Sequence, residues 1–380
     1  MEWKEITLGE IAIFKTGKLN SNAAISNGEY PFFTCSPETL RINNYAFDQE
    51  AILLAGNNAD GNFSIKYYKG KFNAYQRTYV ITPIRGKVDI KFLYYALSLC
   101  LKQFKNMSQG TSTKFLTVTI LNSFSVQLPS ISDQHRIASI LSSLDRKIEL
   151  NNKINADLEE MAQTIFKNWF IDFEPFKDGK FVDSELGMIP EGWKVGTLGD
   201  ITKNKSAKVK ERNDVKVLSP VTTGELVLSE EYFTKQVFSS SIAKYKIVNK
   251  GDFAYNPARV NIGSLGRNEF DFDGCVSPVY VVFSVIDGYE NYFDLFRKTD
   301  FFKDSVASLA IGGVRQSLSY DDLSSIEVII PSENAVEEFN NLYNQMKKTI
   351  KANKLENSRL STLRDTLLPR LMSGELEVPE

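Results

Sequence analysis

The feature of this sequence that most restricts its fold is an internal duplication. The chain reads WKEITLGEI from Trp3 and WKVGTLGDI from Trp193. Farther along, GTSTKFLTVTILNSFSVQLP at 110–129 matches GGVRQSLSYDDLSSIEVIIP at 312–331 at an offset of 202 residues, and Leu, Ser, Val and Pro positions coincide. Because copies of this length are too long for stacked solenoid repeats, the sequence predicts two domains derived from one ancestral unit.

Each copy is followed by a long helical pattern that continues the 202-residue offset without a gap. Apolar residues recur every seven positions, which keeps them on one helix face. The two stripes are Ile137, Leu144, Asn151, Leu158 and Ile165, and Phe339, Met346, Asn353, Leu360 and Leu367. We therefore expect two long helices at 132–170 and 333–372, with N-caps near Ser130 and Ser332 and with the second helix ending or kinking at Pro369.

Both stripes carry asparagine at their third position. If the helices pair in antiparallel fashion about a pseudo-two-fold axis, Asn151 should lie near Asn353, and a buried polar pair would penalise slipped registers. The alternative is that both asparagines face solvent or a partner. We name Asn151 and Asn353 as candidate register residues.

The segments outside the helices mix β and α signals. Short Val, Ile, Tyr and Phe runs separated by Asn and Gly turns are followed by a helical pattern in each copy. The sequence predicts an α+β fold in which two mixed, mostly β domains, at 1–131 and 191–332, are separated by the two long antiparallel helices. Residues 171–190 are expected to form an irregular linker and 373–380 a tail.

Composition excludes several classes of protein. The N-terminus has no basic segment followed by an apolar one, and no window approaches the ~18 apolar residues of a membrane span, so we expect a cytoplasmic protein. The three cysteines are far apart, which gives no zinc or disulfide pattern and suggests buried thiols. The net charge is −2, although residues 1–131 carry 14 basic and 9 acidic residues.

No catalytic or metal-binding pattern stands out. The single histidine, His135, has no duplicate in the second copy. YNPA at 255–258 resembles the Asn-Pro-Pro-aromatic motif of amino-methyltransferases but lacks the second proline and the aromatic residue, and the glycines of IGGVRQS precede no helix-borne lysine. We predict no catalytic residue and no metal in this chain.

Several landmarks together resemble the specificity subunit of type I restriction-modification enzymes over nearly the whole chain. They are the twin W-x-x-x-x-L-G openings, P-S-I-S-D-Q-H-R-I at 129–137, F-K-N-W-F-I-D-F-E-P-F at 166–176, I-P-E-G-W at 189–193, the Y-N and S-P-V-Y pair at 255 and 277–280, and L-L-P-R-L-M-S-G-E-L at 367–376.

The resemblance implies a DNA-reading subunit without its own chemistry. In that family two target recognition domains each read one half of a bipartite, asymmetric site in double-stranded DNA, and the two helices set the spacing. Two modification (methyltransferase) subunits dock on the helices and use S-adenosylmethionine, and restriction subunits, where present, supply ATP- and Mg-dependent translocation and cleavage. This chain would hold no cofactor.

Polar residues in Asn- and Gly-rich loops are the candidate DNA contacts, because amides and guanidinium groups can pair with base edges or phosphates. The candidates are Asn57, Asn58, Tyr75, Gln76, Arg77 and Lys114 in the first copy, and Asn256, Arg259, Asn261, Arg315 and Gln316 in the second. Lys203, Lys205, Lys208 and Lys210 could follow phosphates or form a solvated loop. For each, the alternative is that the residue serves turn geometry or simply faces solvent.

Two other functions stay open at this point. The chain could be a fragment or relative of a single-chain restriction and methyltransferase enzyme, which would need an additional cofactor-binding fold. It could also be a helix-mediated adaptor with no role in DNA binding.

Overall fold

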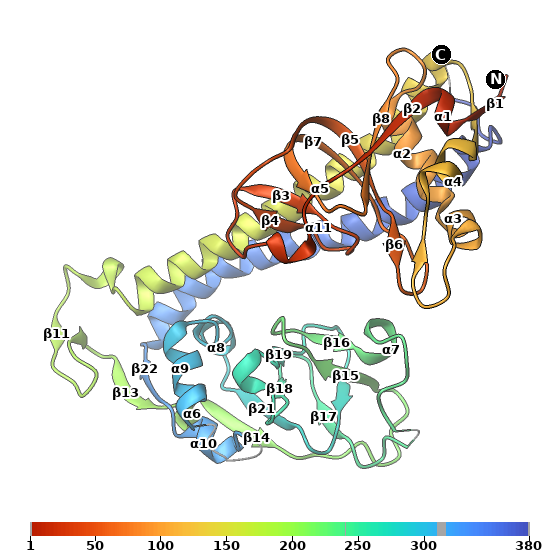
Figure 1. Ribbon diagram of the computed structural model, residues 1–380. Coiled ribbons are helices and arrows are strands. Elements are labelled where there is room, and N and C mark those ends of the chain that lie inside the picture. Colours follow the sequence, from red (N-terminus) through yellow and green to blue (C-terminus); the bar gives the residue numbers. More distant parts are fainter. Residues whose placement is uncertain (1, 240, 310–316, 379–380) are drawn as a thin grey trace. The chain divides into compact units, whose positions relative to one another are not determined.

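The computed structural model describes residues 2–239, 241–309 and 317–378 as two compact units. Unit 1 comprises residues 1–153 and 353–380, and unit 2 comprises residues 154–352. Each long helix therefore contributes one half to each unit. The helices are α5 (Ile131–Phe170) and α11 (Glu333–Met372), drawn in yellow-green and blue in Figure 1.

The β-rich part of unit 1 is built on a six-stranded sheet of order β2-β8-β5-β7-β3-β4. The pairs are antiparallel except β3 with β7. Its elements are β1 (Lys4–Thr7), α1 (Leu8–Ile11), β2 (Ala12–Thr16), η1 (Ser21–Ala23), β3 (Tyr30–Phe33), β4 (Leu40–Ile42), β5 (Phe47–Ala55), β6 (Asn57–Asn58), β7 (Ile65–Ala74), β8 (Thr78–Pro83), α2 (Ile90–Leu99), α3 (Leu101–Met107), β9 (Lys114–Phe115), α4 (Val118–Ser123) and β10 (Ser125–Leu128).

Unit 2 contains two four-stranded sheets, of order β14-β21-β18-β19 and β16-β15-β20-β17. Within the described residues of these sheets, β15 with β20 is the parallel pair. The elements are η2 (Glu174–Phe176), β11 (Phe181–Val182), β12 (Ile189–Pro190), β13 (Lys194–Thr197), α6 (Leu198–Ile201), β14 (Thr202–Lys205), β15 (Lys216–Pro220), β16 (Leu226–Leu228), α7 (Ser229–Tyr232), β17 (Lys246–Val248), β18 (Phe253–Tyr255), η3 (Val260–Ile262), β19 (Leu265–Arg267), β20 (Gly274–Val276), β21 (Val281–Val285), α8 (Glu290–Phe296), α9 (Asp300–Leu309), α10 (Tyr320–Ser324) and β22 (Glu327–Ile330).

The duplication seen in the sequence is present in the fold. Strand β1 pairs with β10 in unit 1 as β13 pairs with β22 in unit 2, and in both units the next turn is a short helix closed by a capping box. The boxes join Thr7 to Glu10 and Thr197 to Asp200. The predicted α+β architecture with two β-rich domains and two long helices is confirmed.

The heptad stripes of both helices are buried or half-buried at every position. In unit 2, Phe339 of α11 packs against Phe166 and Phe170 of α5, whereas in unit 1 Ile137 and Leu141 of α5 share a core with Leu371 of α11. Early residues of one helix thus meet late residues of the other, so the helices run antiparallel within each unit.

Details of the helix ends and the thiols differ from the sequence prediction. Ser130 accepts from the Asp133 amide at 3.2 Å as an N-cap, as predicted. Of the two predictions for Pro369, the ending of the second helix is wrong, because α11 extends to Met372, and the kink stays a prediction. The expectation of buried thiols is correct for Cys275 but wrong for Cys35 and Cys100, which are half-buried because each lies at the margin of a core cluster.

Candidate nucleic-acid interface

The first-domain candidates come together at one corner of unit 1. Strand β6 pairs with β9, which places Asn57 opposite Phe115 and Asn58 opposite Lys114. The backbone amide of Gly56 donates to the carbonyl of Arg77 at 2.8 Å, and that of Leu116 donates to the carbonyl of Gly56 at 2.8 Å. Segments 56–62, 75–77 and 114–116 therefore lie side by side. Figure 1 shows β6 beside the loop that follows α3.

The two neighbouring asparagines at this corner differ in what their side chains do. Asn58 Oδ1 accepts from the backbone amides of Asp60 at 2.9 Å and Asn62 at 3.0 Å, so it holds the turn that the Asn and Gly residues indicate. Asn57 Oδ1 is a buried atom with no hydrogen-bond partner among the described residues. In the chain without DNA, the side-chain oxygen of Asn58 therefore serves turn geometry, which was the alternative to a DNA contact.

A second part of the corner is the turn at Tyr75–Thr78, closed by a 2.9 Å bond from the Thr78 amide to the Tyr75 carbonyl. Tyr75 is half-buried, whereas Gln76 and Arg77 are exposed. The Gln76 amide side chain donates from Nε2 to Asn20 Oδ1 at 2.6 Å. The turn therefore presents an amide group and a guanidinium group to solvent from a fixed backbone.

Three residues of this corner escaped the sequence analysis. Besides Asn20, they are Lys105 and Asn62, joined by a 2.9 Å hydrogen bond from Lys105 Nζ to Asn62 Oδ1. Lys105 and Lys114 both lie against Gly61, which has a φ of +74°. No sequence signal marked Lys105, because it lies in α3 and reaches the corner only through tertiary packing.

The corner has a basic character. Segments 18–20, 56–62, 75–77 and 105–116 carry four basic residues and one acidic residue, Asp60; the basic ones are Lys18, Arg77, Lys105 and Lys114. A surface with exposed cations and amide groups can bind phosphates and base edges together. We call these four segments the first-domain corner.

The second-domain candidates that the structure describes lie on the loop after β18. Asn256 Oδ1 accepts from the Ala258 amide at 3.1 Å, Arg259 is exposed, and Asn261 is exposed and has an interaction partner. The Leu318 amide donates to the Pro257 carbonyl at 3.1 Å, which repeats the bond from Leu116 to Gly56 in unit 1. The two domains thus share this backbone contact after β5 and after β18. Arg315 and Gln316 lie outside the described residues.

The loop after β18 is held in place by a close backbone approach at Gly263 and by a buried ion pair between Arg297 and Asp294. Gly263, at a φ of +95°, sits so close to Thr222 that an added Cβ would lie 2.6 Å from the Thr222 carbonyl oxygen. Arg297 donates from Nη1 to the Leu265 carbonyl at 2.8 Å and pairs with Asp294. Burial, the largest influence, raises the pKa of Asp294, but the charges of Arg297, Lys298 and Lys347 and the hydrogen bond from Arg297 together lower that pKa to about 2.

The lysine-rich segment before β15 has a partly structural role. Lys205 forms an ion pair with the buried carboxylate of Asp252 at 2.7 Å, so it is not free to follow phosphates. Lys203, Lys208 and Lys210 are exposed. The burial of Asp252 raises the pKa of its carboxyl despite this pairing.

The middle of the helix pair in unit 1 holds a polar cluster around Asn151, whose side chain is fully buried. Asn151 Nδ2 donates to Glu356 Oε2 at 2.7 Å and to Asn357 Oδ1 at 2.9 Å, and Lys147 lies 3.2 Å from the same Glu356 oxygen. The hydrogen bonds from Asn151 and Lys147 lower the pKa of Glu356. These partners lie one helical turn beyond Asn353, which is half-buried, and the pairing of Asn151 with Asn353 stays a prediction.

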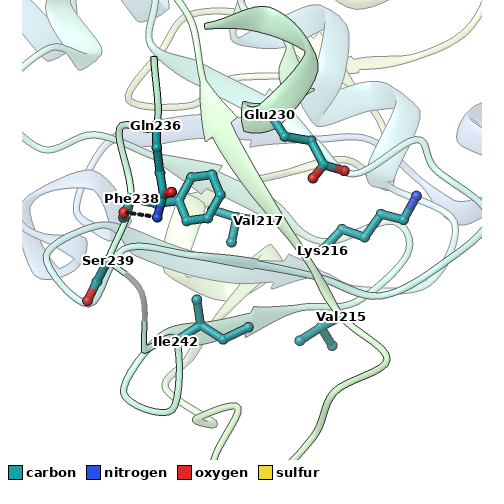
Figure 2. Close-up of a pocket in the computed structure, with 8 residues that line it drawn as sticks. All are labelled: Val215, Lys216, Val217, Glu230, Gln236, Phe238, Ser239 and Ile242. Atoms are coloured by element: carbon teal, nitrogen blue, oxygen red, sulfur yellow. Dashed lines mark hydrogen bonds between the residues drawn. The ribbon is translucent and has the colours of Figure 1, made fainter. Parts of the chain in front are cut away.

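Two pockets elsewhere on the described part of the chain contain no set of side chains arranged for catalysis. One, of about 290 Å³, has apolar walls from Val217, Phe238 and Ile242 with Lys216 and Glu230 at its rim (Figure 2). The other, of about 310 Å³, lies where His135 Nδ1 meets Asp89 Oδ2 at 2.9 Å. Across the described ranges, no group of three or more His, Cys, Asp or Glu side chains could hold a metal ion, and no helix is long and apolar enough to cross a membrane.

Comparisons with known proteins bear on the family and the fold of this chain. The family model for the type I restriction modification DNA specificity domain matches residues 1–160. The type I restriction enzyme EcoDI specificity subunit of Escherichia coli is 31% identical over 375 residues, covering 87% of this chain and 78% of that protein. The MjaIX specificity subunit of Methanocaldococcus jannaschii is 29% identical over 314 residues, covering 79% of this chain and 72% of that protein.

A solved structure shares the architecture. The crystal structure of a type I restriction-modification system S subunit from M. genitalium superposes with a TM-score of 0.63 at 17% identity, covering 97% of this chain and 96% of that one. At this identity the likeness concerns the fold alone.

Proposed function

Because the chain belongs to the family of type I restriction-modification specificity subunits, which recognise DNA and are non-catalytic, we propose that each of its two β-rich domains reads one half of an asymmetric, two-part DNA site. In this family S-adenosylmethionine and ATP belong to the modification and restriction subunits. The alternatives of a methyltransferase fragment and of an adaptor without DNA binding are therefore set aside.

The observation that carries the proposal is a backbone contact repeated in both domains beside side chains that differ. The same backbone bond, from Leu116 to Gly56 and from Leu318 to Pro257, is present in each domain. The polar residues that follow the equivalent strands differ, with Asn57 and Asn58 after β5 and Arg259 and Asn261 after β18. A repeated backbone arrangement that carries different polar groups suits two half-sites of different sequence, because hydrogen-bond donors and acceptors at base edges determine direct readout.

The helices α5 and α11 are proposed to set the spacing between half-sites and to dock two modification subunits. Met161 on α5 and Leu363 on α11 occupy equivalent positions at the 202-residue offset, and they are 50% and 47% exposed. Equivalent apolar side chains left uncovered by their own chain would give two like docking positions for two copies of one partner.

The burial of Asn151 supports a role in helix register. A polar residue inside an apolar stripe destabilises registers in which it loses its partners. We include Asn353, its equivalent in the second stripe, in this role, so that the helix pair would fix the gap between half-sites.

Mapping of N6-methyladenine in DNA from cells that co-express this chain with its modification subunits tests the proposal. The expected result is a two-part methylation motif with a gap of fixed length. A contiguous motif, or methylation independent of this chain, would contradict it.

A further inference from the structure

An exposed pair of amide side chains, Asn20 and Gln76, stands at the edge of the first-domain corner. Gln76 Nε2 donates to Asn20 Oδ1 at 2.6 Å. Their backbones are joined as well, because the Gln76 amide donates to the Leu19 carbonyl at 2.9 Å and Leu19 forms an isolated bridge with Tyr75. Two amides 56 residues apart in sequence are thus held together on the surface at a fixed distance.

The hydrogen bond between the amides determines what they offer to a ligand. With Gln76 Nε2 and Asn20 Oδ1 bonded to each other, Gln76 Oε1 remains as an acceptor and Asn20 Nδ2 as a donor. Neither group has another side-chain hydrogen bond within the part of the chain that the structure describes. If the donor and acceptor of the pair were exchanged, the surface would still present one donor beside one acceptor.

Adenine is the base whose major-groove edge matches this pattern. It presents the N7 acceptor beside the N6 amino donor, whereas guanine presents two acceptors there, cytosine one donor, and thymine one acceptor and a methyl group. We propose that Asn20 and Gln76 together read one adenine of the first half-site, with Asn20 Nδ2 donating to N7 and Gln76 Oε1 accepting from the N6 amino group. The inference rests on the proposed DNA-reading function and adds Asn20 to the recognition residues.

The surroundings favour duplex DNA as the ligand. Lys18 and Arg77, both exposed, flank the pair in sequence, and residues 11–28 contain no acidic residue. Two cations beside a donor and acceptor pair can neutralise phosphates on either side of the base that is read. Gly17 brings the chain close to Ala74, since a Cβ at Gly17 would lie 1.7 Å from the Ala74 carbonyl oxygen, so the position of Asn20 follows from a backbone approach that other residues would prevent.

The variant Asn20→Asp separates base reading from loop anchoring. An aspartate still accepts the hydrogen bond from Gln76, so the loop stays in place, but the donor toward N7 becomes an acceptor. Gln76→Ala removes the acceptor toward the N6 amino group. Gln127→Ala, an exposed glutamine on β10, is the matched control.

The assay is selection of bound duplexes from a randomised DNA library by the complex of this chain with its modification subunits. For Asn20→Asp and Gln76→Ala, the preference for adenine at one position of one half-site should fall about 5- to 150-fold. The other half-site and the control should be unchanged. Equal loss of binding to all sequences, or an unchanged motif, would overturn the inference while leaving the proposed function intact. A wild-type complex that selects no two-part motif would overturn both.

Discussion

Replacing Asn151 tests whether the polar centre of the helix pair fixes the register. Asn151→Ala removes two hydrogen bonds, to Glu356 at 2.7 Å and to Asn357 at 2.9 Å, from a fully buried side chain. Net contributions of roughly 0.5–1.5 kcal/mol per bond give a loss of about 1–3 kcal/mol. The higher helix propensity of alanine offsets about 0.5 kcal/mol of this loss.

Asn151→Leu gives a different expectation. A buried leucine gains roughly 1.5–3 kcal/mol from removal of apolar surface from water, which offsets the lost hydrogen bonds. The stability of this variant should therefore stay near that of the wild type, while slipped registers no longer lose a polar partner. A slip of one heptad moves the helices by about 10.5 Å, which corresponds to a change of about three base pairs in the gap.

Urea unfolding followed by circular dichroism measures the change in the free energy of unfolding. The length of the gap in the methylation motif measures the change in helix register. The exposed Asn168→Ala on the same helix is the control.

The destabilisation by Asn151→Ala should also depend on pH. The pKa of Glu356 is lowered by its hydrogen bonds from Asn151 and Lys147. The stabilisation is therefore present above the ordinary carboxyl pKa of about 4.3 and is lost as the pH falls through the lower folded-state value.

Two results would refute the register argument. One is a single unchanged gap for Asn151→Leu in a fully assembled complex. The other is an unfolding transition of Asn151→Ala that coincides with that of Asn168→Ala at pH 7.

Three further predictions follow from the corners and the helices. Arg77→Ala should weaken binding to all duplexes and reduce the slope of log affinity against log salt by about 0.9, as expected for one lost phosphate contact; an unchanged slope in a salt titration contradicts this. Asp294→Asn leaves the guanidinium of Arg297 buried without its partner and should destabilise unit 2 by about 3–5 kcal/mol in urea unfolding, whereas a shift below about 1 kcal/mol would argue against a stabilising role for this ion pair. Leu363→Glu should reduce the number of bound modification subunits from two to one in native mass spectrometry, and retention of both would remove this position from the docking surface.

The sequence predicted the features that depend on local pattern. The heptad stripes predicted both long helices, and the aligned segments 110–129 and 312–331 predicted two duplicated domains, because period and offset are properties of the chain itself. The sequence did not predict the features that depend on which strands pair with each other. Asn20 meets Gln76 only because Leu19 bridges Tyr75, and Lys105 meets Asn62 only because the fold brings Lys105 of α3 against the turn at Gly61. No short-range pattern encodes these pairings.

The contacts between each β-rich domain and the long helices use different polar residues in the two units, although the domains are duplicated. We call these contacts the junctions. In unit 1, Gln134 at the start of α5 accepts from the Asp89 amide at 2.9 Å, and Tyr95 donates to Asp145. In unit 2, the buried Asn291 of α8 donates to Asn340 and Asn344 of α11, at 2.9 and 3.0 Å.

Because these polar sets are not interchangeable, a domain transplanted without its helix halves would bury unpaired groups at the junction. Residues 154–352 contain both sides of the second junction, and residues 1–153 with 353–380 contain both sides of the first. A domain exchange that keeps the packing of a junction would therefore move a β-rich domain together with one half of each helix, with its boundary near Asn151.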